Sequence, residues 1–398
     1  MSNLENYMKQ QAIFCEQNDS ISKNLYSEYG VKRGLRDEKG QGVLTGLTNI
    51  SDIKAFEYRD GVKSPCDGEL SYRGYNIKDL VTGGKGKRFV FEEGAYLLLF
   101  GELPTDTQLM EFQGRLSDCM ELPTNFTRDV IMKAPTSDIM GSMTRSILTL
   151  GSYDKEKESL EIPNVLRQSM QLIAVFPMLA VYAYHAYCHY EKNESMYIHR
   201  PEKDLSIAEN FLRLLRPDTK FTELEARVLD IALLLHMEHG GGNNSTFTTR
   251  VVTSSGSDTY SVISAAMSSL KGKKHGGANL MVMNMMDDIK SHVKDYEDEE
   301  EITSYLSKIL KKEAFDQKGL IYGMGHAVYS ISDPRERVFK GFVEQLARDK
   351  GREKDMALYN NIEKIAPKLI AKQRQIFKGV SPNIDFYSGF VYDMLNIP

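Results

Sequence analysis

The chain has 398 residues, more than one ordinary domain, so two domains with ample buried surface are expected. An apolar fraction of 41% and a charged fraction of 26% are those of a soluble globular protein, and a net charge of −5 favours neither nucleic acid nor an anionic membrane as partner. The cysteines are scattered without a CxxC pair, which predicts buried thiols in a reducing cytoplasm: Cys15, Cys66, Cys119 and Cys188.

The N-terminal part of the chain is the least regular. Its first 40 residues are polar, so they are no signal peptide, and they carry apolar side chains at helical spacing in Leu4, Met8 and Ile13. They predict an arm that docks on the body or on a partner. Residues 41–80 alternate short β-prone pieces with turn signals and are the only region where hairpins are predicted.

From about residue 89 onward nearly the whole chain is predicted to be helical. The longest apolar run, residues 171–188, is interrupted by Pro177, His185 and three tyrosines, so it predicts a buried core helix rather than a membrane span. The fold class is therefore all-α with a few short N-terminal strands. The other predicted helices are 91–100, 105–120, 125–133, 137–150, 204–215, 261–270, 279–289, 302–310, 339–349 and 355–374.

One further helix, beginning at Thr222, carries the first chemical signal. Thr222 and Glu225 have the spacing of a capping box. The glycines at 240–242 predict its end, which places His236 and His239 on one face of the final turn. The partial negative charge of a helix C-terminus would favour imidazolium there. Two small hydrogen-bonding residues, Asn243 and Ser245, follow at once.

Four more candidates lie further along the chain. His275 and His326 are both flanked by glycines. Arg335 follows an Asp-Pro turn and suits the binding of a carboxylate. Asp385 stands at a predicted helix start, where the dipole would keep it ionised for service as a general base. Each signal alone has an ordinary structural explanation, such as a core histidine or a helix cap.

Taken together, these motifs resemble the citrate synthase family over nearly the whole chain. The segments that carry the resemblance are Tyr72–Tyr75 (YRGY), Leu235–His239 (LHMEH) with Asn243–Thr246 (NNST), Lys274–Asn279 (KHGGAN), Gly325–Val328 (GHAV) with Asp333–Arg335 (DPR), and Pro382–Gly389 (PNIDFYSG).

The resemblance implies a reaction and three catalytic residues. Asp385 would remove a methyl proton from acetyl-CoA, and a neutral His275 would stabilise the enol through the thioester oxygen. His326 would polarise the ketone of oxaloacetate and protonate the new alkoxide. Citryl-CoA is then hydrolysed to citrate and CoA. The family needs no metal and no cofactor beyond the coenzyme A thioester that is its substrate.

The resemblance also implies supporting residues. His239 and Arg335 would hold oxaloacetate, and His236, Asn243 and Ser245 would orient the catalytic rings. Ser330 stands where many relatives have a basic residue that contacts a CoA phosphate. The candidates to replace it are Lys273, Lys274 and Lys378.

The implied architecture has two domains with the site in the cleft between them. The large domain would comprise residues 1–274, with 386–398 returning to it, and the small domain residues 275–385. Closure of the cleft would exclude water. The family implies a homodimer or a larger oligomer, and the cysteine usage a cytoplasmic location.

Three alternative functions stay open, and the sequence differs from the family at its C-terminal end. The motifs do not separate citrate synthase from 2-methylcitrate synthase, which uses propionyl-CoA. A metal-binding module would use His236, His239, His275 and Asp385. The family continues beyond Pro398 with helices that supply two more arginines for oxaloacetate. A protein ending at Pro398 is therefore expected to bind oxaloacetate weakly and turn over little, and a non-catalytic truncated paralogue is the third alternative.

Overall fold

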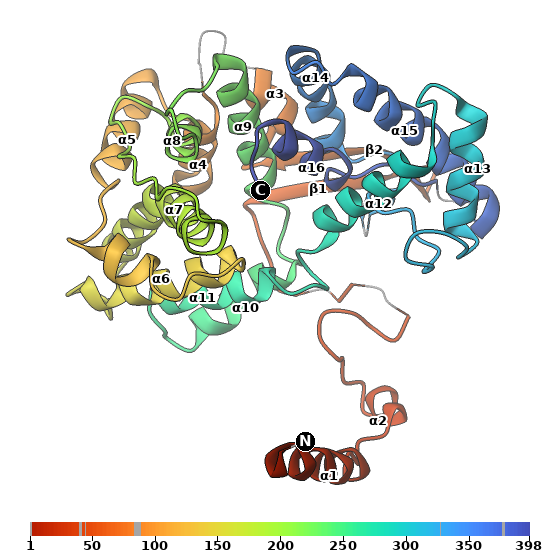
Figure 1. The fold of residues 1–398 in the computed structure, drawn as a ribbon, viewed down its shortest axis with the longest axis horizontal. Helices are drawn as coiled ribbons and strands as arrows, with labels where there is room; N and C mark the ends of the chain where they lie inside the picture. Colours follow the sequence, from red (N-terminus) through yellow and green to blue (C-terminus); the bar gives the residue numbers. More distant parts are fainter. Residues whose placement is uncertain (1, 40–41, 44, 83–88, 327, 376–378) are drawn as a thin grey trace. The chain divides into compact units, whose positions relative to one another are not determined.

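The computed structural model describes residues 2–398 except 40–41, 44, 83–88, 327 and 376–378. By its internal contacts the chain separates into two compact units, Met1–Gly46 and Leu47–Pro398 (Figure 1). This division does not test the predicted domain limits at 275 and 385, which remain a prediction. Lys378 lies outside the described residues.

The first unit holds two helices, α1 (Asn3–Gln17) and α2 (Lys23–Glu28). α1 begins with a capping box, in which the Ser2 hydroxyl accepts from the Glu5 amide and the Glu5 carboxylate accepts from the Ser2 amide. No residue of α1 is buried, and its apolar side chains are exposed. The predicted helical spacing is therefore confirmed, while docking of this arm stays a prediction.

The second unit opens with the predicted hairpin. β1 (Ser51–Arg59) and β2 (Val62–Tyr72) are antiparallel, and β3 (Tyr75–Asn76) adds to β2 in the order β1-β2-β3. Asp60 and Gly61 join the first two strands with φ of 51° and 79°, as the tight turns that suit twisted strands require.

Helices make up most of the rest, as the sequence predicts. They are α3 (Ile77–Thr82), α4 (Phe91–Phe100), α5 (Asp106–Asp118), α6 (Ile139–Tyr153), α7 (Ile162–Lys192), α8 (Ile207–Leu215), α9 (Glu223–His236), α10 (Asn244–Ser254), α11 (Thr259–Leu270), α12 (Ala278–His292), α13 (Glu299–Leu310), α14 (Pro334–Asp349), α15 (Glu353–Arg374) and α16 (Asp385–Met394).

Some boundaries differ from those predicted. The segment 125–133 forms only a π-helical turn, Thr127–Ile131. The polar run after Asn243 is itself a helix, α10, because the Asn243 side chain accepts from the Thr246 amide and caps it. α7 extends well beyond 171–188, with Pro177 inside it. By length and composition alone α7 could cross a membrane, a test that a buried core helix also passes, and half of its apolar window is buried.

The helices of the second unit pack in two groups around α9. α6, α7, α8 and α11 share one apolar cluster. α12 contacts α16, α13 contacts α15, and α14 contacts α15, α16 and β2. α9 contacts α4 and α8 on one side and α14 on the other, and Figure 1 shows the two groups on either side of it. The C-terminal end of α9 therefore reaches the middle of the unit.

Candidate active site

A cavity of about 390 Å³ lies at the end of α9. It is walled by the segment after α9 and by residues of α10, α11, α12, α14 and α16. Segments far apart in the sequence thus share one space. Of the residues proposed from the sequence, those that line it are His236, His239, Asn243, His275, Arg335 and Asp385.

α9 is capped as predicted but ends earlier than predicted. The Thr222 hydroxyl accepts from the Glu225 amide, and the Glu225 carboxylate accepts from the Thr222 amide. The helix stops at His236, and Met237 caps its C-terminus. His239 therefore lies outside the helix, and the expectation that both histidines share its last turn is wrong. His236 remains in the helix, where Nδ1 donates to the Ala232 carbonyl at 2.7 Å.

Burial, not the helix dipole, decides the charge of these rings. Burial and the Arg335 guanidinium lower the pKa of His239 to about 3. Burial likewise lowers the pKa of His236. Both rings are therefore neutral near pH 7, and the expectation that the helix end would favour imidazolium is wrong, since burial disfavours the charged form more strongly.

His326 lies beside His239 without lining the cavity. The two ring centroids are 5.2 Å apart. The amides of Val328 and Tyr329 both donate to His326 Nδ1, at 2.9 and 3.2 Å. Burial lowers the pKa of His326 to about 4. A neutral ring whose Nδ1 accepts carries its proton on Nε2, so His326 can donate a hydrogen bond from Nε2.

His275 is joined to the residues predicted to orient it. Its Nε2 lies 3.3 Å from the Ser245 hydroxyl, which in turn lies 3.1 Å from Asn243 Oδ1. Burial lowers the pKa of His275, which keeps the ring neutral. The Ser245 proton can go to only one of its two neighbours at a time.

Arg335 is held by a carboxylate before any substrate arrives. Its Nε and Nη2 donate to the two oxygens of Asp333 at 3.2 and 3.0 Å. Asp333 also accepts from the Arg335 amide as the N-cap of α14, and from the Ile384 amide at the start of α16. One buried carboxylate therefore fixes the arginine and ties together two of the helices that wall the cavity.

Asp385 is the first residue of α16, as predicted. Burial raises the pKa of its carboxyl, and the neighbouring His236 and Arg335 oppose the rise. The shift is opposite in direction to the effect of a helix dipole, while the expectation that Asp385 is ionised stays a prediction. Within the ionised form, a raised pKa makes the carboxylate a stronger base.

The other predicted contacts are less informative. Lys273 and Lys274 are exposed between α11 and α12. Across the part of the chain that the structure describes, no group of three or more His, Cys, Asp or Glu side chains is placed to hold a metal ion. The histidine-rich metal module proposed as an alternative thus has no ligand cluster among these residues.

The structure adds site residues that the sequence did not single out. Ser388 lies on the same face of α16 as Asp385, and its hydroxyl is 3.3 Å from His236 Nε2. Tyr392, one turn further on, also lines the cavity. The Tyr329 hydroxyl lies 3.0 Å from His239 Nε2. The i, i+3, i+7 spacing from Asp385 was the available signal for the first two. Tyr329 had none, since its partner is 90 residues away.

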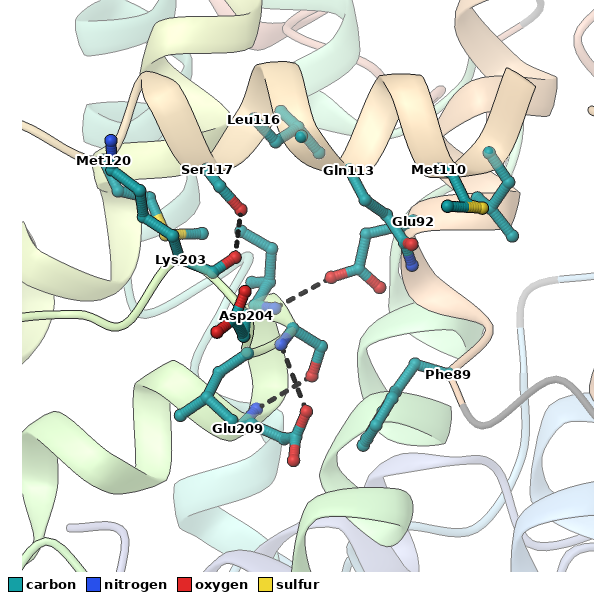
Figure 2. Close-up of a pocket in the computed structure, with 15 residues that line it drawn as sticks. Phe89, Glu92, Met110, Gln113, Leu116, Ser117, Met120, Lys203, Asp204 and Glu209 are labelled. Carbon is teal, nitrogen blue, oxygen red and sulfur yellow. Dashed lines mark hydrogen bonds between the residues drawn. The ribbon is translucent and has the colours of Figure 1, made fainter. Parts of the chain in front are cut away.

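A second cavity of about 490 Å³ lies against α5, away from these residues (Figure 2). Two of its acidic residues, Glu92 and Glu209, hydrogen-bond to backbone amides at the start of α8. One carboxylate oxygen of Glu92 accepts from the Ile207 amide at 2.8 Å, and Glu209 belongs to the capping box of α8. None of the proposed site residues lines it.

The fold is mainly helical, and the first cavity gathers neutral histidines, an arginine and an aspartate around one small space, as an enzyme's active site would. The family model described as citrate synthase, C-terminal domain, matches residues 37–398. The chain belongs to the citrate synthase family, whose members are condensing acyltransferases.

Two relatives show how near the family's branches lie. A citrate synthase of Synechocystis sp. is 34% identical over 354 residues, covering 88% of this chain and 80% of that protein. A 2-methylcitrate synthase of Shewanella oneidensis is 33% identical over 330 residues, covering 83% and 78%.

Solved structures agree with the fold. The citrate synthase of Pyrobaculum aerophilum superposes with a TM-score of 0.73 at 28% identity, covering 92% of this chain and 85% of that one. The ternary complex of the Thermoplasma acidophilum enzyme with carboxymethyl coenzyme A and oxaloacetate also gives 0.73, at 25% identity, covering 91% and 86%.

Proposed function

We propose that this protein condenses acetyl-CoA with oxaloacetate and water to give citrate and CoA. The observation that carries the proposal is the single cavity lined by Asp385, His275, His239 and Arg335. Formation of a thioester enol requires a carboxylate base and a neutral hydrogen-bond donor that line the same cavity.

The first step is proton transfer from carbon. The Asp385 carboxylate takes a proton from the acetyl methyl group, and the electron pair moves toward the thioester oxygen. His275 donates to that oxygen from Nδ1, which requires Nε2 to accept. In the structure the Ser245 hydroxyl donates to Asn243 Oδ1, so it can donate to Nε2, 3.3 Å away, only after turning from that acceptor, and we propose that it turns when acetyl-CoA binds. A neutral histidine acting as electrophile is an established pattern.

The second step forms the carbon–carbon bond. The enol carbon attacks the ketone carbon of oxaloacetate, and the ketone oxygen becomes an alkoxide. His326 donates from Nε2, the nitrogen left protonated by the backbone amides at Nδ1, and gives that proton to the alkoxide. Water then cleaves the thioester of citryl-CoA, releasing citrate and the CoA thiol.

Oxaloacetate is held by charge and by hydrogen bonds. Asp333 accepts hydrogen bonds from Nε and Nη2 of Arg335 but not from Nη1. Nη1 can therefore donate to a substrate carboxylate. His239 supplies a neutral donor beside it. For the CoA phosphates we propose the exposed Lys273 and Lys274, together with Lys378. We further propose a homodimer in the cytoplasm.

A second candidate reaction has direct support. The 2-methylcitrate synthase of Shewanella oneidensis is 33% identical to this chain, almost as similar as the Synechocystis sp. citrate synthase at 34%. With propionyl-CoA the same base would remove a methylene proton, and the product would be 2-methylcitrate.

The test is a thiol-release assay on the purified protein with each acyl-CoA in turn. Release of CoA that requires oxaloacetate, faster with acetyl-CoA than with propionyl-CoA, supports the first proposal. The reverse preference supports 2-methylcitrate synthesis. No oxaloacetate-dependent release with either acyl-CoA refutes both.

A further inference from the structure

Tyr329 lies against two of the site histidines. Its side chain is only 2% exposed. Its hydroxyl is 3.0 Å from His239 Nε2. Its ring centroid is 4.6 Å from that of His326 and 5.5 Å from that of His239. A phenol in this place touches the two rings assigned to oxaloacetate without lining the cavity itself.

Strand β2 fixes the tyrosine in place. Gly68 of β2 donates its amide to the Ser332 hydroxyl at 3.0 Å. A Cβ atom at residue 68 would lie 2.6 Å from Tyr329 Cδ1 and 2.3 Å from the Ser332 carbonyl oxygen. Only glycine permits so close an approach, and it leaves the Tyr329 ring little room to turn away from His239.

Either partner can be the donor in the hydrogen bond between the Tyr329 hydroxyl and His239 Nε2. Burial raises the pKa of Tyr329 and lowers that of His239, so both groups are neutral near pH 7. If the phenol donates, the proton of His239 lies on Nδ1. If the imidazole donates from Nε2, its other nitrogen, Nδ1, carries a lone pair and no proton, and this lone pair repels an oxygen of oxaloacetate.

We propose that Tyr329 is a positioning residue that holds His239 in the Nδ1–H tautomer, so that His239 can donate to an oxygen of oxaloacetate. The inference rests on the proposed function, because the substrate oxygen is what makes the tautomer matter. It is specific to His239. His326 receives its tautomer from two backbone amides and does not depend on the phenol.

The first experiment determines the tautomer directly. The protein is labelled with ¹⁵N-histidine, and the His239 signals are assigned by their loss in His239→Gln. The ¹⁵N shifts of the wild type are expected to show the proton on Nδ1. A proton on Nε2 overturns the proposal. This spectrum needs no variant of Tyr329 and no turnover, so it decides the matter even if the proposed reaction fails.

The second experiment removes the phenol oxygen alone. In Tyr329→Phe we expect the His239 signals to move toward the other tautomer, the KM for oxaloacetate to rise about fivefold, as for loss of one hydrogen bond, and kcat to change less than about twofold. Unchanged tautomer signals and unchanged KM would overturn the proposal.

A matched control is available in Tyr182, whose buried hydroxyl donates to the His199 carbonyl in another part of the fold. Tyr182→Phe should leave the His239 signals and the KM for oxaloacetate as in the wild type. Equal effects from both tyrosines would mean a general structural loss and would also contradict the proposal. A wild type that shows the Nδ1–H tautomer but releases no CoA refutes the proposed function instead.

Discussion

Asp385 is the residue on which the proposed chemistry depends. It is the carboxylate at the start of α16, with His236 and Arg335 near enough to affect its pKa. His326 lies elsewhere, beside His239. The proposed base and the proposed ketone polariser are therefore separate groups, and their removal should have different effects.

We predict that Asp385→Ala lowers kcat by at least about a hundredfold, as loss of a general base does, yet leaves oxaloacetate binding nearly intact. His326→Ala should lower kcat and also weaken oxaloacetate binding, because it removes a contact to oxaloacetate itself. Steady-state rates together with calorimetric titration of oxaloacetate measure the two effects. Similar loss of binding in the two variants would show that these roles are wrongly assigned.

Asp385 should contribute to the acid limb of the pH profile, beside His275 and His236, whose pKa values burial lowers from the ordinary histidine value. His239 and His326, with pKa values lowered to about 3 and about 4, stay neutral through the range from pH 5 to 8. Burial raises the pKa of Asp385, and the base works only when ionised. We therefore predict that kcat/KM for acetyl-CoA falls with decreasing pH at a point above the usual aspartate value of about 4.

The measurement is kcat/KM across pH 4 to 8, with each sample returned to pH 7 to confirm that it regains activity. A profile that declines instead as pH rises from 5 to 8 would mean that a protonated group, not an ionised carboxylate, starts the reaction.

Tyr392 is placed to decide the size of the acyl group. With Asp385 and Ser388 it forms one stripe along α16, and all three line the cavity. Burial and the Asp385 charge raise the pKa of Tyr392 to about 12, so it is a neutral, bulky wall next to the base. In the proposed reaction, the methyl that distinguishes propionyl from acetyl would have to fit in this space.

We predict that Tyr392→Ala raises the ratio of kcat/KM for propionyl-CoA over acetyl-CoA about tenfold, the usual effect of one methylene in a pocket. Ser388→Ala is the control, because it changes the same face of α16 but opens much less space in the cavity. An unchanged ratio in Tyr392→Ala would place the acyl group elsewhere.

At the scale of elements, three helices meet at two glutamates, of which Glu336 is buried and Glu363 partly buried. Glu336 of α14 lies against Glu363 of α15, and burial together with Glu363 raises the pKa of Glu336 to about 9. Tyr387 of α16 donates to Glu363, and Lys340 pairs with it at 2.8 Å. Among the described residues, Glu336 Oε1 has no hydrogen-bond partner.

The consequence is a stability that falls as pH rises. An unfolded glutamate loses its proton near pH 4.5 and the folded Glu336 only near pH 9, so between these values folding takes up a proton. The free energy of unfolding should then decrease by up to about 1.4 kcal/mol per pH unit from this group. We predict a shallower decrease in Glu336→Gln, measured by urea unfolding from pH 5.5 to 8.5. The exposed Glu353→Gln should behave like the wild type, and parallel lines for all three proteins would contradict the prediction.

Local signals made several elements predictable. Gly101, with a φ of 91°, ends α4 where the sequence placed its end. The Thr222–Glu225 capping box starts α9 at the predicted residue. These features depend on a few neighbouring residues, whose conformational preferences are readable in order.

The charge states were not predictable in the same way. His236, His239 and Asp385 all stand at or near helix ends, and the sequence suggested that the dipole would govern them. Burial reverses the charge expected for the two histidines, and it shifts the pKa of Asp385 against the effect of the dipole. It depends on chain segments far away in sequence, as does the pairing of Tyr329 with His239.

At the scale of the whole molecule, the fold explains why the motifs are so far apart. The site residues come from α9, α12, α14 and α16 and from the segments beside them, and α9 contacts helices of both packing groups. Motifs in the right order predicted the family. The limits of two domains at 275 and 385, closure between them and dimer formation remain predictions, because contacts within one chain separate only residues 1–46 from the rest.

The most direct test of the account follows deuterium from trideuterated acetyl-CoA into the product in ordinary water. If Asp385 removes one methyl hydron, the wild type should release CoA only with oxaloacetate and form citrate that retains two of the three deuterons. Asp385→Ala should form essentially none. Dideuterated citrate formed by Asp385→Ala at the wild-type rate would contradict the central claim.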